Sequence, residues 1–397
     1  MIKLNPLYFP SSKSLVVFGR NKLNGTDAIM PLLLELAHKK KIKIIFCVSD
    51  YKLTYKAIQE NVVFRDILIK YGSLNLLGGF YKFQPLRYFI WIFQLSFIFM
   101  HGLVGGRVIH YGELNRFPFT LLRMVYKKKV FLIENNTNEN FYGKAFKEIG
   151  RIQPGRVKKF KKNYLFNDNC MDDRIIYRKS TMKQYNQNSQ YNFYYFGRSR
   201  SRSCWLDYLE KNKSKYFEKY HPNIIDKKCV IIIGAWYFGP FYNNVSEVFE
   251  KMLDVFQEKF HEEYFLFKPH PLSDISYVKK EFEKRNLNYE ITYLHPNLLA
   301  MKAVAFIGNN FSNMMTDGYL LNVPIIEFSH YIDELLKITG GKSTSKKYVD
   351  YFIDNDVSEF NNILHDVISK SNDVDNNLKD AKVDEAGSVA VINLLLA

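Results

Sequence analysis

Twice along the chain, short runs of β-branched and aromatic residues alternate with longer stretches of helical periodicity. This alternation is typical of parallel sheets covered by helices, because each return to a parallel neighbour needs a connection of helix length. The first series occupies residues 1–150 and the second occupies residues 223–345. A chain of 397 residues is long enough for two such domains, each with its own core. We therefore predict a two-domain α/β protein.

The predicted elements follow from these runs. In the first domain we expect strands at residues 15–18, 42–48, 107–111 and 130–133, and helices at 28–38, 88–104 and 117–126. In the second we expect strands at 229–234, 264–267, 303–307 and 323–328, and helices at 245–260, 277–285 and 312–321. Residues 151–222, where Asn, Tyr, Lys and Ser dominate, are predicted to be a linker or an inserted loop, and residues 346–397 are predicted to be C-terminal helices.

No feature of the sequence indicates export. The first residues contain neither a sustained apolar run nor a small-residue cleavage site. The four cysteines lie far apart, without a CxxC pair or a Cys/His cluster at metal-ligand spacing. We therefore expect a cytoplasmic protein with reduced thiols.

Residues 88–104 (YFIWIFQLSFIFMHGLV) form one strongly apolar segment, interrupted by Gln94, Ser96 and His101. Its length is near the lower limit for a membrane span. Predicted strands and helices flank it on both sides, so we favour a buried or interfacial helix over a transmembrane one.

The formal net charge of +16 requires either anionic partners or a solvated basic surface. Basic clusters occur at residues 127–129, 156–162 and 198–202. Aromatic residues between such clusters suit single-stranded nucleic acid, but the clusters are scattered and no nucleic-acid-binding signature accompanies them. An anionic membrane surface or an acidic glycan acceptor accounts for the charge equally well.

The most specific motif is Lys268-Pro269-His270-Pro271, directly after a predicted strand. The two prolines fix the backbone on both sides of the histidine. A rigid imidazole beside a lysine suits the charge that develops on the phosphate of a leaving nucleotide. A simple turn is the alternative interpretation. No Gly-x-Gly-x-x-Gly follows the first predicted strand, which disfavours a nicotinamide or flavin enzyme.

A second motif, the small and polar run Gly308-Asn309-Asn310-Phe311-Ser312-Asn313, opens the helix after the next strand. Backbone N–H groups and hydroxyls at such a helix start form a site for phosphate. Asp317, about one turn further along, is placed to reach a ribose hydroxyl. Alternatively, Ser312 does no more than cap the helix.

Together these motifs resemble the C-terminal half of the His-Pro-motif GT-B transferases. That group includes bacterial sialyltransferases, polysialyltransferases, Kdo transferases and CDP-glycerol polymerases. The resemblance implies two Rossmann-like α/β domains that face a central cleft. It assigns the nucleotide phosphate to His270 and Pro271, and a hydroxyl contact to Ser312 and Thr316, although Ser312 is followed here by an asparagine. The predicted donor site also includes Lys268, Asn310, Asn313 and Asp317.

The same group carries an acidic motif at a strand end of the N-terminal domain, where a carboxylate acts as general base. Glu134 is the partial match in this sequence. Glu113, one strand earlier, and Asp27, in the loop expected after the first strand, are rival candidates. An inverting enzyme needs a carboxylate as general base, whereas a retaining enzyme that works by double displacement needs a carboxylate as nucleophile. The spacing of the residues does not decide between these two mechanisms.

The resemblance implies a glycosyltransferase that moves an acid sugar, Kdo or sialic acid, from a CMP donor onto a surface glycan such as lipopolysaccharide, O-antigen or capsule. We expect no metal or other cofactor, because no DxD motif lies at a strand end. We also expect peripheral contact with the anionic inner face of the cytoplasmic membrane. The alternatives are a CDP-polyol phosphotransferase of the same group and a basic nucleic-acid-binding protein.

Overall fold

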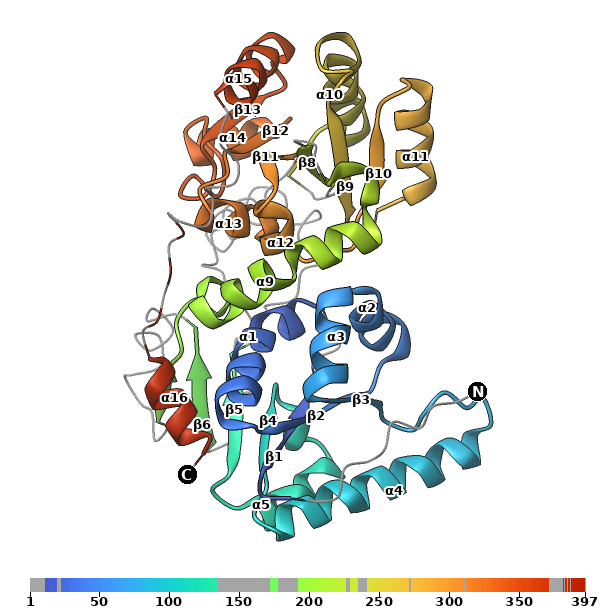
Figure 1. Ribbon diagram of the computed structural model, residues 1–397, viewed down its shortest axis with the longest axis vertical. Coiled ribbons are helices and arrows are strands. Elements are labelled where there is room, and N and C mark those ends of the chain that lie inside the picture. Colours follow the sequence, from blue (N-terminus) through green and yellow to red (C-terminus); the bar gives the residue numbers. More distant parts are fainter. Residues whose placement is uncertain are drawn as a thin grey trace. The chain divides into compact units, whose positions relative to one another are not determined.

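A computed structural model (Figure 1) describes residues 11–19, 23–134, 172–177, 192–225, 229–234, 241–270, 273–309, 312–370 and 387–396, together with residues 381, 383 and 385. These residues belong to two compact units. Unit 1 takes its described residues from 1–137, 163–205 and 384–397, and unit 2 takes them from 206–383. Each unit contains one sheet and its own hydrophobic core.

The described part of unit 1 contains a sheet of seven parallel strands in the order β3-β2-β1-β4-β5-β6-β7. The strands are β1 (Ser14–Phe18), β2 (Lys43–Val48), β3 (Gly72–Leu76), β4 (Arg107–His110), β5 (Val130–Ile133), β6 (Asp173–Ile176) and β7 (Phe193–Tyr195). Strand order reverses between β1 and β4. In open α/β sheets, ligands bind beyond the carboxyl ends of the strands at such a switch point.

Helices cover both faces of this sheet, which explains why its central strands are apolar on both sides. Figure 1 shows α1, α2 and α3 on one face, and α4 and α5 on the other. Their bounds are α1 (Leu23–Lys40), α2 (Lys56–Glu60), α3 (Val62–Tyr71), α4 (Gln84–Leu103) and α5 (Arg123–Tyr126). Helix α16 (Ser388–Leu394) packs beside β7. Helix α9 (Ser203–Tyr220) begins in unit 1 and continues in unit 2.

Where the structure describes unit 2, it has six parallel strands in the order β10-β9-β8-β11-β12-β13. The strands are β8 (Cys229–Gly234), β9 (Tyr264–Pro269), β10 (Tyr289–Ile291), β11 (Ala303–Gly308), β12 (Ile325–Ser329) and β13 (Tyr351–Asp354). The helices are α10 (Val245–Lys259), α11 (Ile275–Lys284), α12 (Pro296–Ala300), α13 (Asn313–Leu320), α14 (Asp333–Thr339) and α15 (Val357–Ser369). The order reverses between β8 and β11, which again marks a switch point.

An aromatic core joins α10, α11 and α15 to the second sheet. Phe256 stacks on Phe265 with ring centroids 4.5 Å apart, and Phe328 stacks on Phe360 at the same distance. On the other face α13 lies close to the sheet, because a Cβ at Gly318 would be only 2.6 Å from the Ile325 side chain. Such close packing holds α13 against strands β11 and β12.

All eight strands expected from the sequence are present, and the α/β class is confirmed. The predicted linker 151–222 differs from expectation, because β6 and β7 fall within it and extend the first sheet. The C-terminal region is not entirely helical, since β13 joins the second sheet and α16 returns to unit 1. The expected helix at 117–126 is a 3₁₀ turn, η3 (Phe119–Leu122), followed by the short α5.

Candidate functional site

The first candidate site lies at the carboxyl ends of β9, β11 and β12 in unit 2. Lys268 is half-buried near the end of β9, where it pairs in register with Ile233 of β8. His270 follows the strand and begins a turn. Its N–H donates to Ser273 Oγ at 2.9 Å, and its carbonyl accepts from the Ser273 N–H at 2.8 Å. Pro271, also predicted here, lies outside the described residues.

The His270 side chain is exposed to solvent, yet nearby protein atoms remove enough water from the imidazole to lower its pKa. The ring is therefore mostly neutral at pH 7 in this structure, and it would donate a hydrogen bond to an anion through one N–H. A phosphate beside it would favour the protonated form and raise the pKa. Its positive charge thus depends on the ligand.

Buried polar groups gather where β11 ends and α13 begins. The side-chain amide of Asn309, which is 4% exposed, has no hydrogen-bond partner for either of its polar atoms among the described residues. The same holds for the hydroxyl of Thr316, in the first turn of α13, and for that of Ser345, in the loop between α14 and β13. Buried polar groups without partners are uncommon in folded proteins and call for an explanation such as a bound ligand or water. Asn309 belongs to the polar run that the sequence singles out, whereas nothing in the sequence indicates Ser345.

The other predicted donor residues have mixed outcomes. Ser312 caps α13, because its Oγ accepts the Met314 N–H at 3.4 Å, and the hydroxyl hydrogen can still be donated elsewhere. Asp317 is completely buried, and its contact with a ribose stays a prediction. Asn310 and the side chain of Asn313 lie outside the described part of the chain.

A buried carboxyl that the sequence did not reveal supports this edge of the sheet. Glu327, on β12, is paired in register with Gly308. It bonds the hydroxyls of Ser343 (2.6 Å), Tyr331 (2.7 Å) and Ser329 (3.0 Å). Burial raises the pKa of Glu327 despite these three hydroxyls, which act in the opposite direction. The network fixes the loop that carries Ser343 to β12.

The second candidate site lies at the carboxyl ends of β1, β4, β5 and β6 in unit 1. Glu134 follows β5 and is completely buried, with its Oε2 accepting the Tyr177 N–H at 2.7 Å. Glu113 follows β4 and is half-buried, with its Oε2 accepting the Tyr111 N–H at 2.7 Å. Tyr111 in turn donates its hydroxyl to the Gly25 carbonyl at 2.6 Å. The topology therefore brings these carboxylates to one edge of one sheet.

Asp27 does not lie in a loop as expected, because α1 already begins at Leu23. Its carboxylate is 2.6 Å from the Arg200 guanidinium, in an ion pair that is largely buried. Arg202 is likewise buried and pairs with Glu35 at 3.1 Å. The basic cluster 198–202 is therefore not an exposed surface, because two of its three arginines neutralise acids within unit 1.

Tyr177 was missed by the sequence reasoning. Its ring is 1% exposed, and its hydroxyl has no hydrogen-bond partner in the described ranges. Burial raises the pKa of Tyr177 well above its usual value, and the charges of Tyr111, Glu134 and Asp27 add to this effect. The hydroxyl is thus a neutral donor close to two of the predicted carboxylates. No local signal could have identified it, since only the pairing of β6 with β5 places it there.

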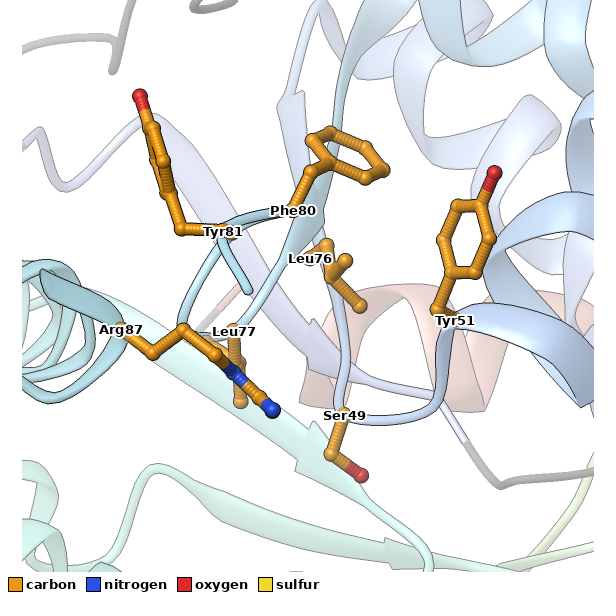
Figure 2. Close-up of a pocket in the computed structure, with 8 residues that line it drawn as sticks. Ser49, Tyr51, Leu76, Leu77, Phe80, Tyr81 and Arg87 are labelled. Atoms are coloured by element: carbon orange, nitrogen blue, oxygen red, sulfur yellow. The ribbon is translucent and has the colours of Figure 1, made fainter. Parts of the chain in front are cut away.

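A pocket of about 310 Å³ opens at the carboxyl ends of β2 and β3 in the same unit. Figure 2 shows the Tyr51 and Phe80 rings on one side and the Arg87 guanidinium directed from α4 toward Ser49. The two rings meet edge to face, with centroids 5.5 Å apart. Aromatic rings and a guanidinium suit a ligand that has both apolar faces and an acidic group.

Three polar side chains stabilise the strand ends beside this edge. His110 Nδ1 accepts the Gly112 N–H at 3.0 Å, so its Nε2 carries the proton and donates to Asp172 at 2.9 Å. Burial lowers the pKa of His110, which is therefore neutral. Burial opposes ionisation of Asp172, but hydrogen bonds from His110 and Arg123 lower its pKa well below the usual range. These contacts join β4, β6 and α5.

No protein-family model and no curated protein matches this sequence. Among solved structures, the chain is similar to a putative UDP-N-acetylglucosamine 2-epimerase from Listeria monocytogenes, with a TM-score of 0.54, 12% identity, and 96% of this chain and 94% of that chain covered. It is also similar to UDP-N-acetylglucosamine 2-epimerase from Rickettsia bellii, with a TM-score of 0.50, 15% identity, and coverage of 96% and 93%. The glycotransferase of kitacinnamycin is similar with a TM-score of 0.48 and 9% identity, and the match covers 96% of this chain and 98% of that chain. At these identities the likeness concerns the fold alone, which is the two-domain GT-B fold.

Proposed function

We propose that this chain is a cytoplasmic glycosyltransferase that uses a nucleotide-activated sugar. One observation carries the proposal: the unpartnered side-chain amide of Asn309 and hydroxyl of Thr316 lie where β11 ends and α13 begins, at the same sheet edge as His270. The capped start of α13 lies there too, and helix N-termini favour anions. Such a set of donors suits the phosphate and hydroxyl groups of a nucleotide.

For the donor we propose a CMP-activated acid sugar, Kdo or sialic acid, as in the His-Pro-motif group. The turn formed by Lys268-Pro269-His270-Pro271, called the KPHP turn below, supports this assignment. Its Lys268 and His270 would offset the charge of a single leaving phosphate. Desolvation lowers the pKa of His270 in the absence of a ligand, and the negative charge of a bound phosphate would raise it again. We propose no metal for this step.

For the acceptor we propose a surface glycan or glycolipid bound at the carboxyl edge of the first sheet. The pocket between Tyr51 and Arg87 would hold part of it. Glu134 is our first candidate for the base or nucleophile, and Glu113 and Asp27 remain the rivals. The neutral Tyr177 hydroxyl would orient the acceptor or the carboxylate.

A second candidate is a reaction on a UDP sugar, because two solved structures similar to this chain, with TM-scores of 0.54 and 0.50, carry the name UDP-N-acetylglucosamine 2-epimerase. A CDP-polyol phosphotransferase is a third. The nucleic-acid alternative is weakened by the ion pairs that bury Arg200 and Arg202.

The proposal is tested by thermal shifts of the full chain with CMP, CDP and UDP. At about 100 times its Kd a ligand stabilises a protein by about 2.7 kcal/mol, which is roughly 5–10 °C for a unit of this size. We expect CMP to give such a shift, His270→Ala to remove it together with sugar transfer, and the unliganded melting temperature to stay unchanged. His261→Ala, an exposed histidine before β9, is the matched control.

The outcomes separate the candidates. A thermal shift with UDP alone, together with conversion of UDP-N-acetylglucosamine in the absence of an acceptor, would indicate an epimerase and contradict the proposed transferase activity. A shift with CDP alone would favour the phosphotransferase. A salt-sensitive gel shift with RNA and no nucleotide response would favour nucleic-acid binding. Transfer that survives in His270→Ala would refute the role of the KPHP turn.

A further inference from the structure

Helix α4 has an apolar outer face that nothing in the described structure covers. Tyr88, Phe89, Ile92 and Phe93 are 58–68% exposed. Their spacing continues through Phe99, Met100 and Leu103, which places all of these side chains on one side of the helix. Ser96 is the polar exception on this side. Soluble proteins rarely expose so many large apolar side chains in one row unless the row is an interaction site.

A neighbouring segment extends the same surface. Phe117, Leu121 and Met124 are exposed on or beside η3 and α5, which pack against α4. A hollow of about 290 Å³ lies between the two, lined by residues that include Phe99 and Leu121. The apolar surface therefore covers two adjoining elements of unit 1. We call this surface the α4 face.

The charge around the α4 face is strongly one-sided. Residues 67–133 contain nine lysines and arginines and a single acidic residue, Glu113. Lys82 and Arg87 are exposed at the amino end of α4. At the other end Lys129 Nζ donates to the Gly105 carbonyl at 3.3 Å, and the exposed Lys127 and Lys128 precede it. Cations at both ends of an apolar stripe complement an anionic lipid surface.

The inner side of α4 is fixed to the sheet by polar contacts. Gln94 Oε1 accepts the Gly78 N–H at 2.8 Å, and its Nε2 donates to the Leu76 carbonyl at 3.0 Å. His101 Nε2 donates to the Ser14 carbonyl at 3.1 Å, while its Nδ1 is 2.7 Å from the Tyr126 hydroxyl. Helix α4 is long and apolar enough to span a bilayer. Spanning would break these contacts, whereas lying on the surface preserves them.

We propose that the α4 face docks on the surface of an anionic lipid bilayer. Helix α4 lies in the membrane plane, with its aromatic outer side among the head groups and its inner side still on the sheet. Lys82 at one end and Lys127 and Lys128 at the other contact the phosphates of anionic lipids. This attachment is peripheral, and it requires no catalytic activity.

Vesicle flotation of the full chain tests this proposal. We expect binding to vesicles of phosphatidylcholine with 30% phosphatidylglycerol, and at least tenfold weaker partitioning to phosphatidylcholine alone. The variant Phe89→Ser/Ile92→Ser/Phe93→Ser should lose at least tenfold in partitioning, and its melting temperature should not fall, since these side chains are exposed. Ile69→Ser on α3 is the matched control, because Ile69 and Phe89 are both 68% exposed.

A second pair of variants tests how much the lysines beside the α4 face contribute to vesicle binding. Lys127→Ala/Lys128→Ala should weaken binding to anionic vesicles severalfold, while Lys279→Ala/Lys280→Ala, an exposed pair on α11, should not. Equal binding by the serine variant and the wild-type protein would overturn the proposal. So would a dimer in light scattering that the serine variant dissociates while neither protein binds vesicles, since a second copy would then cover the α4 face. Resistance of bound protein to alkaline carbonate would indicate a span instead.

Discussion

At the carboxyl ends of β5 and β4, Glu134 and Glu113 differ in burial although both accept a backbone N–H. Glutamine preserves this acceptor at either position and removes only the ionisable group. If Glu134 is the base, Glu134→Gln should lower turnover roughly 10²–10⁴-fold, the usual contribution of general-base catalysis. Glu113→Gln, the matched control, should keep most activity. Donor consumption by both variants provides the measurement, and full activity in Glu134→Gln would transfer the role to Glu113 or Asp27.

At the scale of elements, Glu327 joins β12 to the loop that carries Ser343. Because burial raises its folded pKa above the usual 4.5, the folded state binds more protons than the unfolded state between these two values. Stability from this group is therefore present at low pH and falls as pH rises through that window. Glu327→Gln removes the ionisable group and with it this loss of stability at higher pH. We expect the urea midpoints of the variant and the wild-type protein to agree near pH 4, below the usual pKa, and the variant to become the more stable toward pH 8.

Glu262→Gln, an exposed glutamate of the same unit, should show no such divergence. Parallel pH profiles for Glu327→Gln and the wild-type protein would mean that the buried carboxyl is ionised throughout the range, and that the three hydroxyls outweigh its burial.

Elements also show what the sequence could predict. Strands with long apolar runs, such as β5, β8 and β11, were predicted because their residues alone favour a buried strand. β3 (GSLNL), β7 (FYY) and β13 (YFID) were missed, because short strands at or near a sheet edge owe their form to the neighbouring strand. The KPHP turn and the start of α13 are local motifs, so the sequence alone predicts them. Tyr177 and Glu327 can be identified only from the pairing of strands in the folded structure. Arg200 looks like part of an exposed basic cluster in the sequence, because its partner Asp27 lies 173 residues away.

The whole chain leaves unit 1 within α9 and returns to it near its end. Gly387 makes this return possible, because its φ is +73° and a Cβ there would lie 1.7 Å from the Tyr195 carbonyl oxygen. Ser388 then donates to Glu35 at 2.8 Å. Val391 is completely buried, whereas Val389 on the same helix is 72% exposed. Residues near the end of the chain are thus part of the core of its first domain.

Val391→Ala should therefore weaken unit 1 selectively. Deleting two buried methyl groups costs roughly 2 kcal/mol, which is about a thirtyfold larger opening constant. Hydrogen exchange followed by mass spectrometry should show faster exchange in peptides of α1 and β7 and unchanged exchange in α10 and α15. Val389→Ala should leave both sets unchanged. Faster exchange throughout unit 2 as well would mean that the two units unfold as one, so that the return of α16 stabilises the whole chain and not its first domain alone.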